Sequence, residues 1–222
     1  MLVQVLSCRF WGSFPAFCTF NKIDINMGEK VLATYSIAEY LAWEQAAELR
    51  HEFHNGELFA MAGGTRNHGK LGANIITELT IIERKNGCTT YNGDVKIRIE
   101  ASNRFVYPEA SVVCGKIETS VHDADSITNP VLVAEVLSDS TEAYDRGAKF
   151  RLYQQLPAFR EYLLIDQHRP VVTVFYRRED KIWEMREVMG LDQSIPLQSL
   201  DANIQMADLY RNTEDLKEPL AK

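Results

Sequence analysis

Apolar side chains recur at helical spacing in the first half of the chain. Ser36 and Glu39 stand at the ends of a Ser-Ile-Ala-Glu capping box, so we expect a helix of about three turns to begin there. A longer helix should open after Gly63-Gly64 and close near Asn86-Gly87, because the apolar residues between them fall on one helical face. Each helix therefore has one side that packs on a core.

Strand patterns lie between and after these helices. His51–Phe53 and Leu58–Met61 flank Asn55-Gly56, whose two residues both accept positive φ, and this pattern predicts a hairpin. Two longer strands, Tyr91–Glu100 and Arg104–Gly115, should follow the second helix, joined by a short turn.

The second half of the chain begins with a continuous apolar run at 130–137, typical of a strand covered on both faces. A helix should then run from Asp139 to about Gln155, where Leu156-Pro157 stops it. Three more strands are expected at Glu161–Asp166, Val171–Arg178 and Lys181–Val188. This order predicts an α+β (α/β) fold, with a central mixed sheet flanked by helices and preceded by a helix and a hairpin.

The chain has 222 residues, which suits one domain that buries most of its surface. Residues 1–30 lack periodicity, and Met27 precedes a typical domain start, so we interpret 1–30 as a disordered leader or a misassigned start. The expected domain spans 31–211, with a C-terminal tail at 212–222.

Composition indicates a soluble protein of the reducing cytoplasm, without a membrane segment. The four cysteines show no paired short spacing, so neither a zinc ribbon nor a secreted disulfide scaffold is indicated. The net charge of −7 argues against a large nucleic-acid footprint unless cations gather locally. Candidates for such a local group are Lys85, Lys96, Arg98 and Arg104.

Glu135 interrupts the apolar run at 130–137. An ionised carboxylate buried in a strand costs several kcal/mol unless it is paired or binds a metal. With Glu109 at the end of the preceding strand and Lys149 downstream, Glu135 completes the set of groups that metal-dependent phosphodiester hydrolysis requires. The alternative interpretations are a Glu135–arginine pair at the sheet margin, an exposed Glu109, and an i,i+4 pair of Lys149 with Asp145.

This order of elements, with acids in the second and third core strands and a lysine beyond, resembles the PD-(D/E)XK nuclease fold. The chain is similar in particular to the bacterial Uma-two family of restriction-endonuclease-like domains, over about residues 35–188. The residues that carry the resemblance are 51–58, Asn67-His68, 93–98, 107–113, 135–138, Asp145, Lys149, Tyr153 and 161–166.

The resemblance implies a metal-dependent endonuclease that acts on DNA. Glu109, Glu135 and the Val136 carbonyl would hold Mg²⁺, with Mn²⁺ as a second possibility, while Lys149 positions the nucleophile or stabilises the developing charge. Glu52 would be a third acid in the site, as opposed to a solvent-facing residue of an edge hairpin. A homodimer is expected, since cleavage of two strands requires two sites.

Further roles are open for two polar residues near these strands. His68 could contact a phosphate or the attacking water at a helix start, or be a surface residue near the cap. Asp94 could support the metal, or pair with Lys96 or Arg98. By contrast, Phe150 and Tyr153 should belong to the core and not to a base-stacking surface.

Two positions depart from the family pattern. Glu109 stands where the family usually has aspartate, and its carboxylate lies one bond, about 1.5 Å, further from the backbone. Leu137 occupies the position where the wider fold often has its lysine, so Lys149 would take over that role. Two other functions therefore compete with an endonuclease: a non-catalytic module that keeps the fold for binding or assembly, and a hydrolase acting on a small phosphodiester.

Overall fold

The computed structural model describes residues 3–9, 17–23, 34–61 and 63–219. The chain divides into two compact units, 1–33 and 34–222. The first unit contains an antiparallel hairpin of β1 (Val3–Arg9) and β2 (Phe17–Ile23). The leader expected at 1–30 falls in this unit and lies partly outside the described residues. All features below belong to the second unit.

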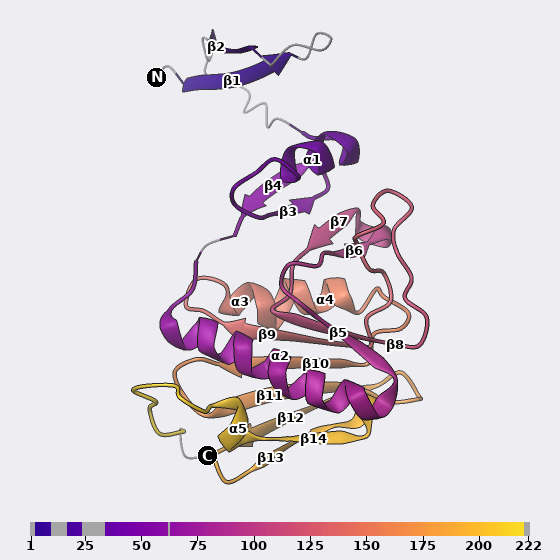
Figure 1. The fold of residues 1–222 in the computed structure, drawn as a ribbon, viewed down its shortest axis with the longest axis vertical. Coiled ribbons are helices and arrows are strands. Elements are labelled where there is room, and N and C mark those ends of the chain that lie inside the picture. Colours follow the sequence, from indigo (N-terminus) through magenta and orange to yellow (C-terminus); the bar gives the residue numbers. More distant parts are fainter. Residues whose placement is uncertain (1–2, 10–16, 24–33, 62, 220–222) are drawn as a thin grey trace. The chain divides into compact units, whose positions relative to one another are not determined.

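A six-stranded mixed sheet forms the centre of the second unit, with strand order β12-β11-β10-β9-β8-β5 (Figure 1). Its strands are β5 (Cys88–Asn92), β8 (Ala110–Cys114), β9 (Leu132–Leu137), β10 (Glu161–Asp166), β11 (Val171–Arg177) and β12 (Trp183–Met189). Only β9 and β10 pair in parallel among these neighbours. The predicted fold class is confirmed, and the run around Glu135 is a fully buried central strand.

Each of the two strands predicted at 91–100 and 104–115 is in fact two strands in different sheets. Gly93-Asp94 separates β5 from β6 (Ile97–Ile99), and Pro108 separates β7 (Arg104–Val106) from β8. The physical reason for the second break is that proline has no N–H to donate to a ladder. Asp94 lies in the first break, where it pairs with Arg50 at 2.7 Å and not with Lys96 or Arg98.

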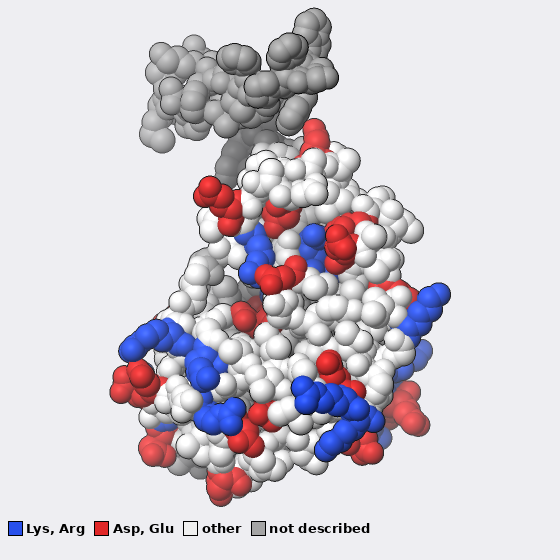
Figure 2. Space-filling view, in the orientation of Figure 1, with Lys and Arg blue, Asp and Glu red and all other residues white. Residues whose placement is uncertain are grey.

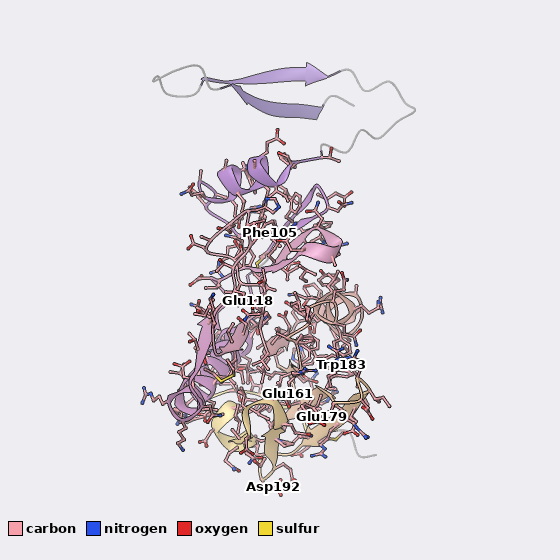
Figure 3. All side chains as sticks on the ribbon, turned by 90° about the vertical axis from the view of Figure 1, so that its right-hand side faces the viewer. Phe105, Glu118, Glu161, Glu179, Trp183 and Asp192 are labelled. Carbon is pink, nitrogen blue, oxygen red and sulfur yellow. A yellow bond between two sulfur atoms is a disulfide. The ribbon has the colours of Figure 1, made fainter. Side chains whose placement is uncertain are left out.

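The smaller sheet has four strands in the order β4-β3-β7-β6. The predicted hairpin supplies β3 (His51–His54) and β4 (Glu57–Ala60), and the short 3₁₀ turn η1 (Glu100–Ser102) joins β6 to β7. Helix α1 (Ile37–Glu44) starts with the predicted capping box and packs on this sheet. Three fully buried rings, Tyr40, Phe53 and Phe105, hold helix and sheet together. Phe105 is labelled in Figure 3.

Helix α2 (Arg66–Asn86) covers one face of the central sheet (Figure 1). Thr65 caps its first turn, and Gly87 ends it in the left-handed region at φ 65°, where a side chain would be strained. Its buried stripe of Leu71, Ile75, Leu79 and Ile82 packs on residues of β8 and β9 that point to this side. The predicted helix and both of its ends are confirmed.

The opposite face is covered by a helical segment in three parts. They are α3 (Glu142–Tyr144), a π-helical turn (Asp145–Lys149) and α4 (Phe150–Tyr153). The helix predicted from Asp139 is thus present, but it starts later and is wound more loosely in the middle. Phe150 and Tyr153 pack in the core on this side, as predicted.

The C-terminal elements were not predicted from the sequence. They are the hairpin of β13 (Ser194–Leu197) and β14 (Ala202–Gln205), the 3₁₀ turn η3 (Gln198–Leu200) and the short helix α5 (Met206–Leu209). Their apolar residues join the core that α2 covers. Beyond them, the Lys217 amide donates to the His168 carbonyl at 2.8 Å.

A disulfide joins Cys88 and Cys114, which lie directly opposite each other on β5 and β8. Figure 3 shows it as a yellow bond beside α2. The sequence did not predict this bond, because the two cysteines are 26 residues apart and only the strand register brings them together. None of the helices in the described part of the chain has the length and apolarity needed to cross a membrane.

We expect Phe105→Ala to lower the free energy of unfolding by about 3–5 kcal/mol, because it removes a fully buried ring from the contact between α1 and the smaller sheet. Urea denaturation measures the loss. The control is Phe59→Ala on β4, whose ring is 45% exposed and whose removal should cost no more than about 1 kcal/mol. Equal losses for the two variants would contradict the proposed packing.

Candidate active site

Lys149 is the centre of a buried cluster of charged side chains. The π-helical turn places it at the end of five residues that begin with Asp145, and its side chain is almost fully buried. Its Nζ lies 2.9 Å from Glu135 Oε1, 3.3 Å from Glu52 Oε1 and 3.8 Å from Asp145 Oδ1. It also donates to the Tyr107 carbonyl at 3.2 Å. One ammonium thus connects β9, β3, the π turn and the segment that precedes β8.

Glu135 reaches the cluster from the middle of β9. Its Oε1 accepts hydrogen bonds from Lys149 and, at 2.9 Å, from the Tyr153 hydroxyl. Burial raises the pKa of the Glu135 carboxyl to about 8, although the Lys149 charge opposes this rise. The carboxyl is therefore mostly protonated at neutral pH, and this lowers the cost of burying it.

Glu52 reaches the same ammonium from β3, but its pKa is shifted in the opposite direction from that of Glu135. It accepts from the Tyr107 amide at 3.2 Å, and its Oε2 lies 2.9 Å from His54 Nε2. Burial favours the neutral form, but the Lys149 charge and the contact with His54 outweigh it and lower the pKa of Glu52 to about 2. Glu52 is therefore the ionised partner of the lysine.

Lys149 remains charged in this setting. Burial lowers the pKa of its ammonium, but the three surrounding carboxylates raise it well above its usual value. Burial also raises the pKa of Asp145, the third of these acids. The resulting state pairs one ammonium with one fully ionised carboxylate and leaves the other acids able to change their charge.

Glu161 is another buried glutamate, and its hydrogen bonds differ from those of Glu135. Glu161 on β10, labelled in Figure 3, accepts from the backbone amides of Gln198 and Ser199 and from the Ser199 hydroxyl. It ties η3 to the sheet and contacts no charged side chain among the described residues. Glu135 differs, because its partners are the ammonium and phenol of other side chains.

Glu109 and His68 form a separate pair on the side of α2. Ala110 of β8 pairs with Ala134 of β9. If this antiparallel register is continued by one residue, the backbone of Glu109 lies opposite that of Glu135. However, Glu109 Oε1 lies 3.5 Å from His68 Nε2, and its Oε2 lies so close to Gly72 that a side chain there would collide with it. Both side chains are partly exposed.

The structure therefore brings together some of the predicted site residues. Glu135, Glu52 and Lys149 converge, and Glu109 and His68 meet beside them on the face covered by α2. Within the described residues, no group of three or more His, Cys, Asp and Glu side chains is arranged to hold a metal ion.

Sequence reasoning missed the part played by the Tyr107 backbone. Its amide donates to Glu52, and its carbonyl accepts from Lys149, so one peptide segment holds both partners of the ion pair. The signal was the Tyr107-Pro108 step, because a proline ends the regular ladder and leaves the preceding backbone groups free for side chains. The hydroxyl of Tyr144, 3.4 Å from His54 Nε2, was also not anticipated.

A mixed sheet with helices on both faces, and with buried acids and a lysine at its centre, defines a nuclease-like fold. Comparison with solved structures agrees. The chain is similar to the crystal structure of "a putative nuclease belonging to DUF820" from Anabaena variabilis, with a TM-score of 0.63 at 14% identity, covering 79% of this chain and 97% of that one. Identity this low shows the fold alone.

Sequence comparison gives the family. A family model described as "Putative restriction endonuclease" (Uma2) matches residues 37–208, and the chain belongs to this family. Uncharacterized protein slr1290 of Synechocystis sp. is 34% identical over 173 residues, covering 78% of this chain and 90% of the relative. Uncharacterized protein sll1609 of the same organism is 33% identical over 168 residues, covering 74% of this chain and 95% of the relative. The predicted family resemblance is confirmed.

The two acids on Lys149 should give the metal-free protein opposite pH dependences of stability. The folded-state pKa of Glu52, about 2, lies below its usual 4.5, so its stabilising contribution is present above pH 4.5 and is lost as pH falls through 2. The folded-state pKa of Glu135, about 8, lies above 4.5, so its contribution is present below pH 4.5 and is lost as pH rises through 8.

Urea denaturation in the presence of EDTA, repeated across this pH range, measures both effects. Glu52→Gln should reduce the loss of stability in acid, and Glu135→Gln should reduce the loss toward pH 8. The control Glu187→Gln changes an exposed residue of β12 and should keep the wild-type profile. A Glu135→Gln profile that still falls between pH 4.5 and 8 as steeply as wild type would contradict this assignment of protonation states.

Proposed function

We propose that this chain is a metal-dependent endonuclease that hydrolyses phosphodiester bonds of DNA in the cytoplasm. The observation that supports this most is the buried Lys149 ammonium held between Glu135 and Glu52. A protein interior rarely contains such a group of charges without a use for it, because well-packed apolar residues would be equally or more stable. Membership of a family described as restriction endonucleases supports the same chemistry.

The donor groups fit Mg²⁺ or Mn²⁺ in their chemistry. Carboxylates and backbone carbonyls are the hard oxygen ligands that both ions take. Glu109 immediately precedes β8, and the β8–β9 register, continued by one residue, sets it opposite Glu135. In this proposal Glu109, Glu135 and the Val136 carbonyl would hold the ion. When bound, it supplies positive charge for the phosphate and lowers the pKa of a water molecule.

The chain's own residues have distinct tasks in the proposed reaction. Lys149 presents a permanent positive charge to the phosphate, where negative charge develops during hydrolysis. Glu52 and the Tyr107 carbonyl hold that ammonium in place, and Tyr153 holds the Glu135 carboxyl. His68, beside Glu109, would contact the water or a phosphate oxygen. Two-strand cleavage would require a homodimer.

A non-catalytic module that retains the nuclease fold is the second candidate. Its support is the pairing of Glu109 with His68, which directs this carboxylate toward α2. Such a module would bind or assemble without consuming DNA.

Nicking of supercoiled plasmid and cleavage of single-stranded DNA separate the two candidates. The full chain should cleave in Mg²⁺ or Mn²⁺ and not in EDTA. Glu135→Gln should reduce the rate by at least about a hundredfold, because it removes a carboxyl group that the proposed metal site needs as a ligand. The control Glu187→Gln should cleave at the wild-type rate. If wild type and Glu135→Gln are equally inert and calorimetry detects no metal binding, the non-catalytic module is correct.

Glu109→Asp should increase activity. Aspartate is the residue usual at this position in the family, and the shorter side chain would withdraw the carboxylate from His68 and Gly72 toward the sheet. A shift of about 1 Å at a reacting centre can change a rate about a hundredfold. The metal concentration for half-maximal nicking should fall at the same time. A Glu109→Asp variant that is folded but slower than wild type would show that the site is adapted to glutamate.

A further inference from the structure

Four basic residues near the core strands have different environments in the structure. Lys96 pairs with Asp123 at 3.1 Å. Arg98 is buried against Glu100 at 2.8 Å and Asn103, and its guanidinium lies over the Phe105 ring. Lys85 is exposed in the last turn of α2, on the surface of that helix. The remaining residue, Arg104, has no hydrogen bond or ion pair from its side chain to any described residue.

Arg104 is held so that part of its guanidinium is inside the protein. Its Nε is buried and has no hydrogen-bond acceptor among the described residues, while the side chain as a whole is partly exposed. A buried N–H that lacks an acceptor costs about 1–3 kcal/mol, so natural structures seldom leave one without a reason. An acceptor that arrives from outside would remove this cost.

The position of Arg104 connects it with the candidate active site. It is the first residue of β7 and lies directly opposite His54 of β3, so both side chains leave the same face of the smaller sheet. His54 contacts Glu52, which contacts Lys149. Arg104 therefore stands at the outer end of a line of polar side chains that leads to the buried ammonium.

Tyr144 provides a second link on the helical side. Its hydroxyl lies 3.4 Å from His54 Nε2. Burial, more than any nearby charge, raises the pKa of the Tyr144 phenol, and the charges of Lys149 and Arg104 both oppose this rise. Arg104 and Lys149 thus act on the same hydroxyl.

We propose that Arg104 binds a backbone phosphate of DNA and thereby orients the strand toward Lys149. A guanidinium presents several N–H donors in one plane and suits the paired oxygens of a phosphodiester. This inference rests on the proposed endonuclease function and adds a substrate-binding residue to it.

The overall charge makes such a contact important for affinity. The chain carries a net charge of −7, and over the described residues on the face in Figure 2, acidic and basic side chains are interspersed. The described part of this face therefore has no broad basic surface, which gives single cations without a partner, such as Arg104, more weight in phosphate binding.

Fluorescence anisotropy with a labelled duplex of about 20 base pairs, in EDTA and over a series of NaCl concentrations, tests the proposal. Arg104→Gln should weaken binding about ten- to a hundredfold at low salt and reduce the slope of log K against log [NaCl] by about 1. Arg104→Lys should restore the slope but not the full affinity, because it keeps the charge and loses the planar donors.

The matched control is Arg186→Gln, which removes the same charge from an exposed position on β12. Equal affinities and slopes for Arg104→Gln and Arg186→Gln would overturn the proposal. A second result would also overturn the proposal: Arg104→Gln weakens the binding of inorganic phosphate but leaves the affinity for the duplex unchanged. The ligand of Arg104 would then be a free phosphate and not DNA. Thermal melts check that Arg104→Gln is folded. If it is not folded, the affinity and salt slope of Arg104→Lys test the proposal: an affinity equal to that of the wild type would overturn it.

Failure of this inference is distinguishable from failure of the proposed function. If metal-dependent nicking is lost in Glu135→Gln but duplex binding is unchanged in Arg104→Gln, only the role of Arg104 is wrong. If the wild type neither binds duplex nor nicks plasmid, both proposals are wrong.

Discussion

The buried ammonium of Lys149 is the interaction on which the rest of the site depends. A lysine charge in a protein interior costs several kcal/mol unless it is paired and hydrogen-bonded; here Glu52 is its ionised partner, and Glu135 and Asp145 lie beside it. These acids come from the central sheet, the smaller sheet and the π turn, so satisfying one charge requires both sheets and the helical segment to be in place. The Tyr107 backbone adds the fourth connection.

The site has two halves that differ in burial. Around Lys149 the side chains are buried and close to one another, and Glu52 and Glu135 differ widely in pKa although they share one lysine. On the side of α2, Glu109 and His68 are partly exposed and held by a single long contact. The buried half holds the positive charge, and the half beside α2 is partly open to solvent.

Sequence predicted the elements whose signals are local. The capping box at Ser36, the Asn55-Gly56 hairpin and the charge of Glu135 in an apolar run all act within a few residues, and the structure has the expected element at each. Features set by tertiary pairing were not accessible. Pro108 was a local signal for a break, but which sheet each half joins is set by tertiary pairing, and the Cys88–Cys114 bond follows only from strand register. Whether Arg104 has a partner likewise depends on side chains distant in sequence.

The central claim is that the buried lysine serves catalysis and not only folding. The most direct measurement is the rate of metal-dependent plasmid nicking by Lys149→Arg and Lys149→Gln, with circular dichroism to confirm folding and calorimetry to measure metal binding. The account predicts that folded variants still bind metal but that Lys149→Gln loses nicking by about a hundredfold or more, with Lys149→Arg in between. A folded Lys149→Gln variant that nicks DNA at the wild-type rate would contradict it.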